Sequence, residues 1–176
     1  MPATNWKNLI LLIICGTLTT LLIGFLFTGL RIFQHDQPPF QFFTYGLLGS
    51  VIYAMLLLRT KKDFAAAFIF LVFLDIVVLR IVSIPLLILR ILSALVLAIS
   101  VFSYWRFLRS QPPFWLRPLL LAGLFACVTL GLLLLVSVFY WQPDIRLLIE
   151  AQTFFALLIG FGLGIGFEVF NFIHKK

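Results

Sequence analysis

The stretch LLLAGLFACVTLGLLLLVSVFYW, residues 119–141, decides the fold of this chain. It contains 23 residues in succession without a charged side chain. About 20 apolar residues in a helix cross the hydrocarbon core of a bilayer. The stretch does not alternate apolar with polar side chains as barrel strands do, and a helix bonds every backbone group within its own segment. It therefore predicts a transmembrane helix.

The whole chain has the composition that this stretch implies. Of its 176 residues, 63% are hydrophobic and 11% are charged, whereas soluble domains average about 45–50% and about 25%. This composition excludes an ordinary soluble domain, a disordered chain and a disulfide scaffold. We expect one integral membrane domain over residues 1–176, with the lipid bilayer as its surroundings.

Polar gaps divide the chain into six apolar segments. The predicted spans are residues 9–30, 40–58, 64–82, 86–105, 119–141 and 147–173. The third and fourth come from one run, residues 64–108, which as a single helix would be about 67 Å long and must therefore fold back. The expected fold is all-α: a polytopic transmembrane helical bundle of six spans with short loops.

The basic residues predict the orientation of these spans. Nine Lys and Arg residues lie on the side shared by the two termini, the second loop and the fourth loop, and four lie on the other side. Basic loops stay in the cytoplasm, so we expect a bacterial cytoplasmic membrane with both termini cytoplasmic. The formal net charge of +7 is explained by this topology, and we expect no nucleic-acid partner.

Small residues recur at the spacing of a helical turn in several spans. Gly16 and Gly24 share a face of the first span. The fifth span carries the series Gly123, Cys127 and Gly131. Helices in lipid associate through close backbone approach, which small side chains permit. These faces predict packing within the bundle or docking of another membrane protein.

The sixth span has two interleaved pairs of glycines. Gly160 and Gly164 form one pair, and Gly162 and Gly166 form the other. At 100° per residue the two pairs point to nearly opposite sides of the helix. We expect at least one pair to meet another helix closely. The sixth span is therefore the better candidate for docking, with one face against the chain's own bundle and the other against a partner protein.

Four charged residues fall within or beside the predicted spans: Asp75, Arg80, Arg90 and Glu168. A charge inside the membrane is costly and should have a partner. A hairpin corner near Ser83 would bring Asp75 and Arg90 to one depth, which predicts an ion pair. Snorkelling of Arg90 to the surface and a proton or ion relay through Asp75 remain alternatives.

Glu168 lies about one and a half turns from the predicted cytoplasmic end of the sixth span. We expect its carboxylate to reach the headgroups or to meet Lys175, Lys176 or Arg109. A role as a coupling site is the alternative.

The sequence lacks the parts of an enzyme. It has no HExxH, GxSxG or Walker motif, and Cys15 and Cys127 stand apart within apolar runs. We therefore expect no catalytic residues, no metal site and no cofactor. The leading prediction is a non-enzymatic membrane subunit or scaffold of a larger membrane complex, which binds other membrane proteins through small-residue faces.

The alternative prediction is a small-molecule transporter, or the substrate-binding membrane subunit of one. It would use Asp75, Arg80, Arg90 and Glu168. The sequence Gln-Pro-Pro-Phe occurs at residues 37–40 and again at 111–114. This recurrence favours the alternative if it reflects the inverted repeat of transporter folds, although proline is also common at helix starts.

Overall fold

The computed structural model describes residues 6–29, 39–58, 84–108, 113–139 and 145–174. All regular secondary structure in these ranges is helical, so the all-α prediction is confirmed. The elements are α1 (Trp6–Gly29), α2 (Pro39–Leu58), α4 (Ile84–Ser103), the π-helix η1 (Tyr104–Leu108), α5 (Arg117–Phe139) and α6 (Ile145–His174).

Three of the described helices are long and apolar enough to cross a membrane. Their candidate spans are Lys7–Phe27, Arg117–Leu135 and Ile149–Ile173. The described parts of α2 and α4 contribute the shorter apolar stretches Gln41–Leu57 and Ala94–Phe107. The described chain thus has three candidate spans and does not support the predicted six. The predicted third span, residues 64–82, lies outside the described residues.

Residues within each helix explain where α2 and α5 begin and how the hydroxyl groups of α1 and α2 are satisfied. Pro39 opens α2 and Pro118 is the second residue of α5, positions where a proline removes no helical hydrogen bond. The hydroxyls of Thr17, Thr20 and Ser50 each donate to the backbone carbonyl four residues earlier, at 2.7 Å. These polar side chains are therefore satisfied within their own helices, as an apolar environment requires.

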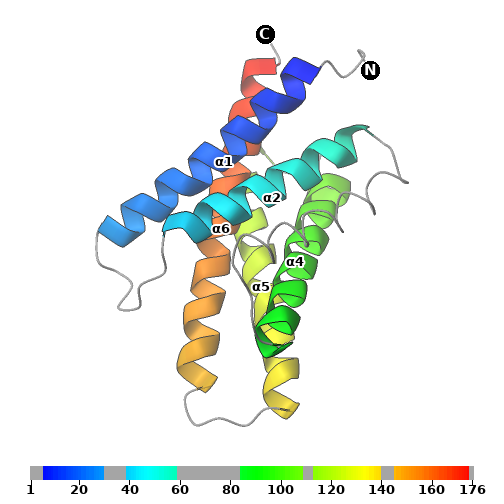
Figure 1. Ribbon diagram of the computed structural model, residues 1–176. Coiled ribbons are helices and arrows are strands. Elements are labelled where there is room, and N and C mark those ends of the chain that lie inside the picture. The colour runs from blue at the N-terminus through cyan, green and yellow to red at the C-terminus, as the bar shows by residue number, and fades with distance from the viewer. Residues whose placement is uncertain (1–5, 30–38, 59–83, 109–112, 140–144, 175–176) are drawn as a thin grey trace.

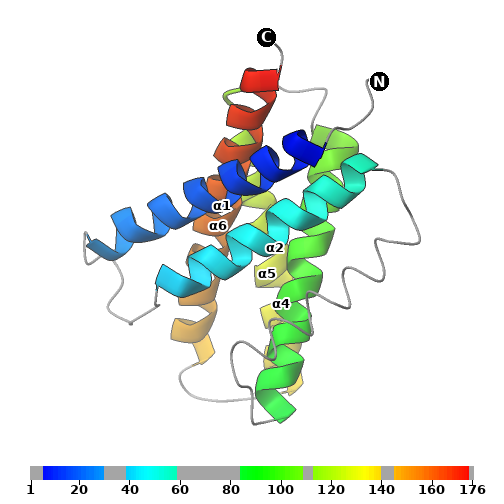
Figure 2. The same ribbon diagram turned by 45° about the horizontal axis from the view of Figure 1, so that its top comes forward.

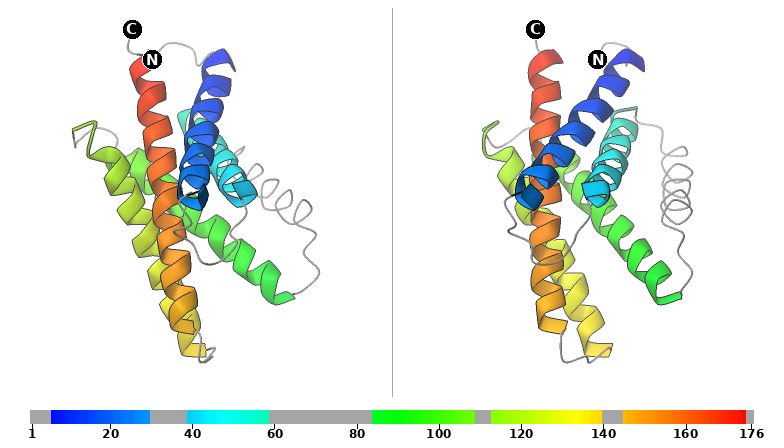
Figure 3. Two further views of the ribbon diagram at one scale, coloured as in Figure 1. Left: turned by 90° about the vertical axis from the view of Figure 1, so that its left-hand side faces the viewer. Right: turned by 60° about the vertical axis from the view of Figure 1, so that its left-hand side comes forward.

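α5 and α6 run antiparallel, side by side, and form the long axis of the bundle (Figures 1 and 3). α1 crosses α6, α2 lies against α1, and α4 packs between α2 and α5 (Figure 2). α1 begins at the end of the bundle where α6 finishes. α2 finishes toward that same end, whereas α4 begins at the opposite one (Figure 3).

α6 lies at the centre of this arrangement. In its candidate span 61% of the residues are buried, against 33% in α1 and 28% in α5. Phe167 of α6 stacks on Tyr53 of α2 with ring centroids 4.1 Å apart, and Phe155 meets Phe42 edge-on at 4.7 Å. The core therefore consists of aromatic and aliphatic side chains that α6 contacts from several sides.

α1 exposes a continuous apolar stripe on its outer side. The stripe consists of Ile10, Ile14, Leu18, Leu22 and Phe25, each between 46% and 65% exposed. Their spacing of three or four residues places them on one face of the helix. A face of this size and kind fits lipid rather than water, so it indicates the side of α1 that faces the bilayer.

Candidate functional site: a tyrosine–glutamate–arginine cluster

Two of the described charged residues, Arg117 and Glu168, meet a buried tyrosine at one place inside the bundle. The Tyr104 hydroxyl donates to Oε1 of Glu168 at 2.7 Å. Nη1 of Arg117 lies 3.3 Å from both carboxylate oxygens of Glu168. The Arg117 and Glu168 side chains are 16% and 13% exposed, and Tyr104 is fully buried. These three residues form a largely buried polar cluster that ties together η1, α5 and α6.

The fold places each member of the cluster at a helix end or close to one. Arg117 is the first residue of α5, Tyr104 is the first residue of η1, and Glu168 lies in the last two turns of α6. Because α5 and α6 are antiparallel, the start of one lies beside the end of the other. The Glu168 carboxylate thus lies at the N-terminus of α5, where the helix dipole favours a negative charge.

Tyr104 is also the residue at which the backbone changes from α-helix to π-helix. Here α4 gives way to the π-helix η1, which covers five residues. π-helical turns are rare and often occur at functional sites. The Tyr104 ring also lies 5.8 Å from Phe167 and 6.0 Å from Tyr53. Aromatic rings therefore cover the inner side of the cluster.

The cluster can hold its three helical elements together by charge and hydrogen bonding. The Glu168 carboxylate, the Arg117 guanidinium and the Tyr104 phenol fix α6, α5 and η1 in one arrangement. Within the described ranges no group of three His, Cys, Asp or Glu residues is arranged to hold a metal ion.

The sequence analysis named other partners for Glu168. Its interpretation favoured headgroups or Lys175, Lys176 and Arg109, all of which lie outside the described residues. The structure instead gives Arg117 and Tyr104 as partners. Arg117 is one of the nine basic residues that the sequence analysis assigns to the side of the membrane where Glu168 lies. Their location on the same side of the membrane was the one feature of the sequence that indicated a contact between Arg117 and Glu168.

The other charged candidates are not brought into this cluster by any described contact. Asp75 and Arg80 lie outside the described residues, and Arg90 is described only as a backbone position of α4. The ion pair between Asp75 and Arg90 therefore stays a prediction.

Both glycine pairs of α6 lie against helices of this chain. A Cβ added at Gly162 would come within 2.6 Å of the Thr20 Cα in α1, and one at Gly166 within 2.5 Å of the Gly16 Cα. On the opposite side, the corresponding distances for Gly160 and Gly164 are 2.8 Å to the Ala122 Cα and 2.5 Å to the Pro118 Cα. α1 therefore occupies one small-residue face of α6, and α5 occupies the other.

Two contacts strengthen the packing around α1. The Thr19 hydroxyl donates to the carbonyl of Gly162 at 2.8 Å, across the α1–α6 interface. Gly24 lies directly against the ring of Phe42 in α2. Both glycines singled out in the first span, Gly16 and Gly24, thus lie at helix contacts.

α5 carries a small-residue face of a different kind. No atom of the described chain lies within 4 Å of a Cβ added at Gly123 or Gly131. Cys127, midway between them, is exposed. The other eight glycines with described surroundings would each bring a Cβ within 3.0 Å of a neighbour. We call Gly123, Cys127 and Gly131 the open face of α5.

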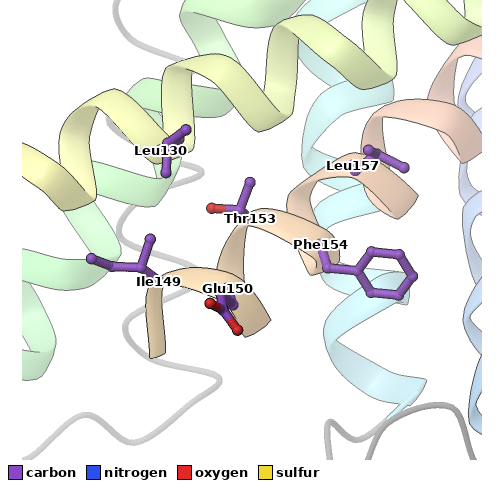
Figure 4. Close-up of a pocket in the computed structure, with 6 residues that line it drawn as sticks. All are labelled: Leu130, Ile149, Glu150, Thr153, Phe154 and Leu157. Atoms are coloured by element: carbon purple, nitrogen blue, oxygen red, sulfur yellow. The ribbon is translucent and has the colours of Figure 1, made fainter. Parts of the chain in front are cut away.

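A shallow groove of about 310 Å³ lies between α5 and α6, away from the cluster. Figure 4 shows Leu130 of α5 facing the residues of α6 that complete the lining. These are Ile149, Glu150, Thr153, Phe154 and Leu157. The Thr153 hydroxyl has no hydrogen-bond partner among the described residues. The groove is mostly apolar and widely open, as expected of a lipid-facing surface.

The comparisons with known proteins add no relative to these observations. No protein-family model matches the chain, and no curated protein or solved structure is significantly similar to it.

Proposed function

We propose that this chain is a non-enzymatic, membrane-embedded helical subunit or scaffold of a larger membrane complex. The observation that carries the proposal is the open face of α5. Every other glycine with described surroundings lies against a neighbour, and only Gly123 and Gly131 have open space beside them. A helix of another membrane protein is the partner that this face fits.

The physical reason is the way helices associate in lipid. Lipid tails are as apolar as leucine, so helices gain stability mainly where their backbones approach closely. Gly123, Cys127 and Gly131 follow one another at intervals of four residues, and Leu134 lies on the same side of α5, half exposed. Small residues flanked by leucine favour a close crossing by a partner helix.

The proposal includes a six-span topology in a bacterial cytoplasmic membrane with both termini cytoplasmic. Its support is the direction of the helices. α1 begins and α6 finishes at one end of the bundle (Figure 1), as an even number of crossings requires. α2 finishes and α4 begins at opposite ends of the bundle (Figure 3), as one further crossing between them requires.

The test compares an open glycine with an enclosed one. Gly123→Leu and Gly131→Leu should leave the purified protein as stable as the wild type, because a Cβ at either position meets no described atom within 4 Å. Both variants should lose the partner that co-purifies in mild detergent. Gly164→Leu is the matched control, since it should disturb the chain itself. Retention of a stoichiometric partner by both open-face variants would contradict the proposal.

A second candidate function is small-molecule transport, or capture of a substrate for a transporter. The observation in its favour is the cluster itself, which combines a largely buried carboxylate with a π-helical turn. Glu168 would be its coupling residue near one end of the bundle, with Asp75, Arg80 and Arg90 contributing near the other end. Purification without a partner but with a bound small molecule would favour this candidate.

A further inference from the structure

The most exposed aromatic side chains gather at one end of the bundle. Of the large hydrophobic residues that the structure describes, five are more than 60% exposed, and four of these are aromatic. The four are Phe107, Phe114, Trp115 and Phe172, which we call the aromatic collar. The fifth, Leu22, lies on the apolar stripe of α1.

The cluster fixes where the collar lies. Phe107 follows Tyr104 by three residues, Trp115 precedes Arg117 by two, and Phe172 lies one turn beyond Glu168. Tyr104, Arg117 and Glu168 are in direct contact. The collar residues must therefore surround the same end of the bundle, although they come from η1, the turn before α5, and α6.

Exposed aromatic rings at helix ends have a preferred environment. The amphipathic ring of tryptophan, here Trp115, prefers the boundary between hydrocarbon and headgroups, and the three phenylalanines beside it supply apolar surface. Residues 113–116 form a turn closed by the Leu116 amide, which donates to the Pro113 carbonyl at 3.0 Å. This turn holds Phe114 and Trp115 at the surface, so the collar indicates the level of the headgroups.

Charge distinguishes this end from the other. With the six-span topology proposed above, nine basic and two acidic residues belong to the collar end, and four of each belong to the opposite end. The whole net charge of +7 thus lies at the collar. Among the described basic residues, Arg106 is exposed and directly precedes Phe107 of the collar.

We infer that the aromatic collar and Arg106 form a binding surface for the headgroups of anionic phospholipids. The collar rings lie at the level of the lipid ester groups, and the Arg106 guanidinium binds the lipid phosphate by charge-assisted hydrogen bonds. A basic segment at this level attracts an anionic leaflet over roughly a Debye length. The inference rests on the topology of the proposed function and not on the partner at the open face of α5.

The experiment follows the thermal unfolding of the purified protein in mild detergent during titration with lipid. The probes are dioleoylphosphatidylglycerol and dioleoylphosphatidylcholine, which share their acyl chains and differ in headgroup charge. We expect the anionic lipid to raise the melting temperature more, and the difference to shrink in high salt. Arg106→Gln should weaken the apparent affinity for the anionic lipid about fivefold.

The matched control is Arg146→Gln, which removes the same charge at the opposite end of the bundle and should leave the lipid preference unchanged. Arg106→Lys keeps the charge and should retain most of the effect. Replacing Phe114 and Trp115 together by serine should weaken stabilisation by both lipids alike.

Equal stabilisation by the two lipids would overturn the inference. So would an equal loss in Arg106→Gln and Arg146→Gln, because the preference would then reflect net charge alone. Neither result bears on the partner test with Gly123→Leu, so a failure here is distinct from a failure of the proposed function.

Discussion

α5 and α6 have similar apolar sequences and similar small-residue spacing, but they occupy different places in the bundle. α6 is enclosed: α1 lies against one of its glycine pairs and α5 against the other. Among the described residues, α5 is enclosed on the side of α6 and α4, and none of them lies within 4 Å of a Cβ added at Gly123 or Gly131. The same sequence pattern thus serves internal packing in one helix and remains available in the other. Small residues permit close approach of another helix, but their spacing does not determine which helix packs there.

The largest effect should come from filling a contact of α6. Gly166→Leu would drive a side chain into the backbone of α1, since even a Cβ would lie 2.5 Å from the Gly16 Cα. We expect a loss of about 3 kcal/mol or more in unfolding free energy, because the backbone of α1 cannot yield as a flexible side chain can. Denaturant unfolding in detergent measures it. An unchanged midpoint would show that α6 is not enclosed on this side.

The next effect concerns the ion pair that fastens α6 to α5. Glu168→Gln leaves the Arg117 guanidinium without its carboxylate, and we expect a loss of about 3 kcal/mol in stability. Arg117→Gln should cost less, because a carboxylate can take up a proton and a guanidinium cannot release one.

The double variant of Glu168 and Arg117 checks the same contact. It should lose less than the two single variants added together, because neither orphaned charge remains. A strictly additive cycle, measured by denaturant unfolding, would show that the two side chains do not interact. Loss of transport by a stable Glu168 variant would favour the second candidate function.

A smaller effect is expected at Tyr104. Tyr104→Phe keeps the ring against Phe167 and removes the hydroxyl that donates to Glu168. A hydrogen bond to a charged group contributes about 1.5–3 kcal/mol, and we expect the lower value because Arg117 still holds the carboxylate. Thermal unfolding measures the change. A loss as large as that of Glu168→Gln would mean that the ring packing had also been disturbed.

The smallest effect on stability should occur at the open face of α5. A Cβ at Gly123 meets no described atom within 4 Å, and a leucine is a better helix former than glycine by roughly 0.5–1 kcal/mol. We expect the isolated protein to be unchanged or slightly more stable. A loss comparable to that of Gly166→Leu would remove the distinction between the two helices.

The sequence predicted the boundaries of the helices better than it predicted which helices pack against one another. The predicted boundaries 40–58 and 119–141 lie close to α2 and α5, because length and hydropathy are local properties. The pairing of Glu168 with Arg117 joins residues 51 positions apart. It depends on the antiparallel packing of α5 and α6 and on the rotation of each helix, and neither is encoded in a local pattern. The spacing of Gly160, Gly162, Gly164 and Gly166 indicated two faces but could not assign α5 and α1 to them.

The hydroxyl groups of α1 and α2 have a consequence for how the protein is made. Thr17, Thr20 and Ser50 bond to carbonyls of their own helices, so these three hydroxyls need no neighbouring helix as they enter the bilayer. Glu168, in contrast, is compensated by contacts with Arg117 and Tyr104, which precede it in the sequence. During synthesis α6 emerges after both of them, so its carboxylate meets an arginine and a phenol that the ribosome has already delivered. Because its partners are made first, the Glu168 carboxylate of α6 does not have to remain in lipid without a compensating group.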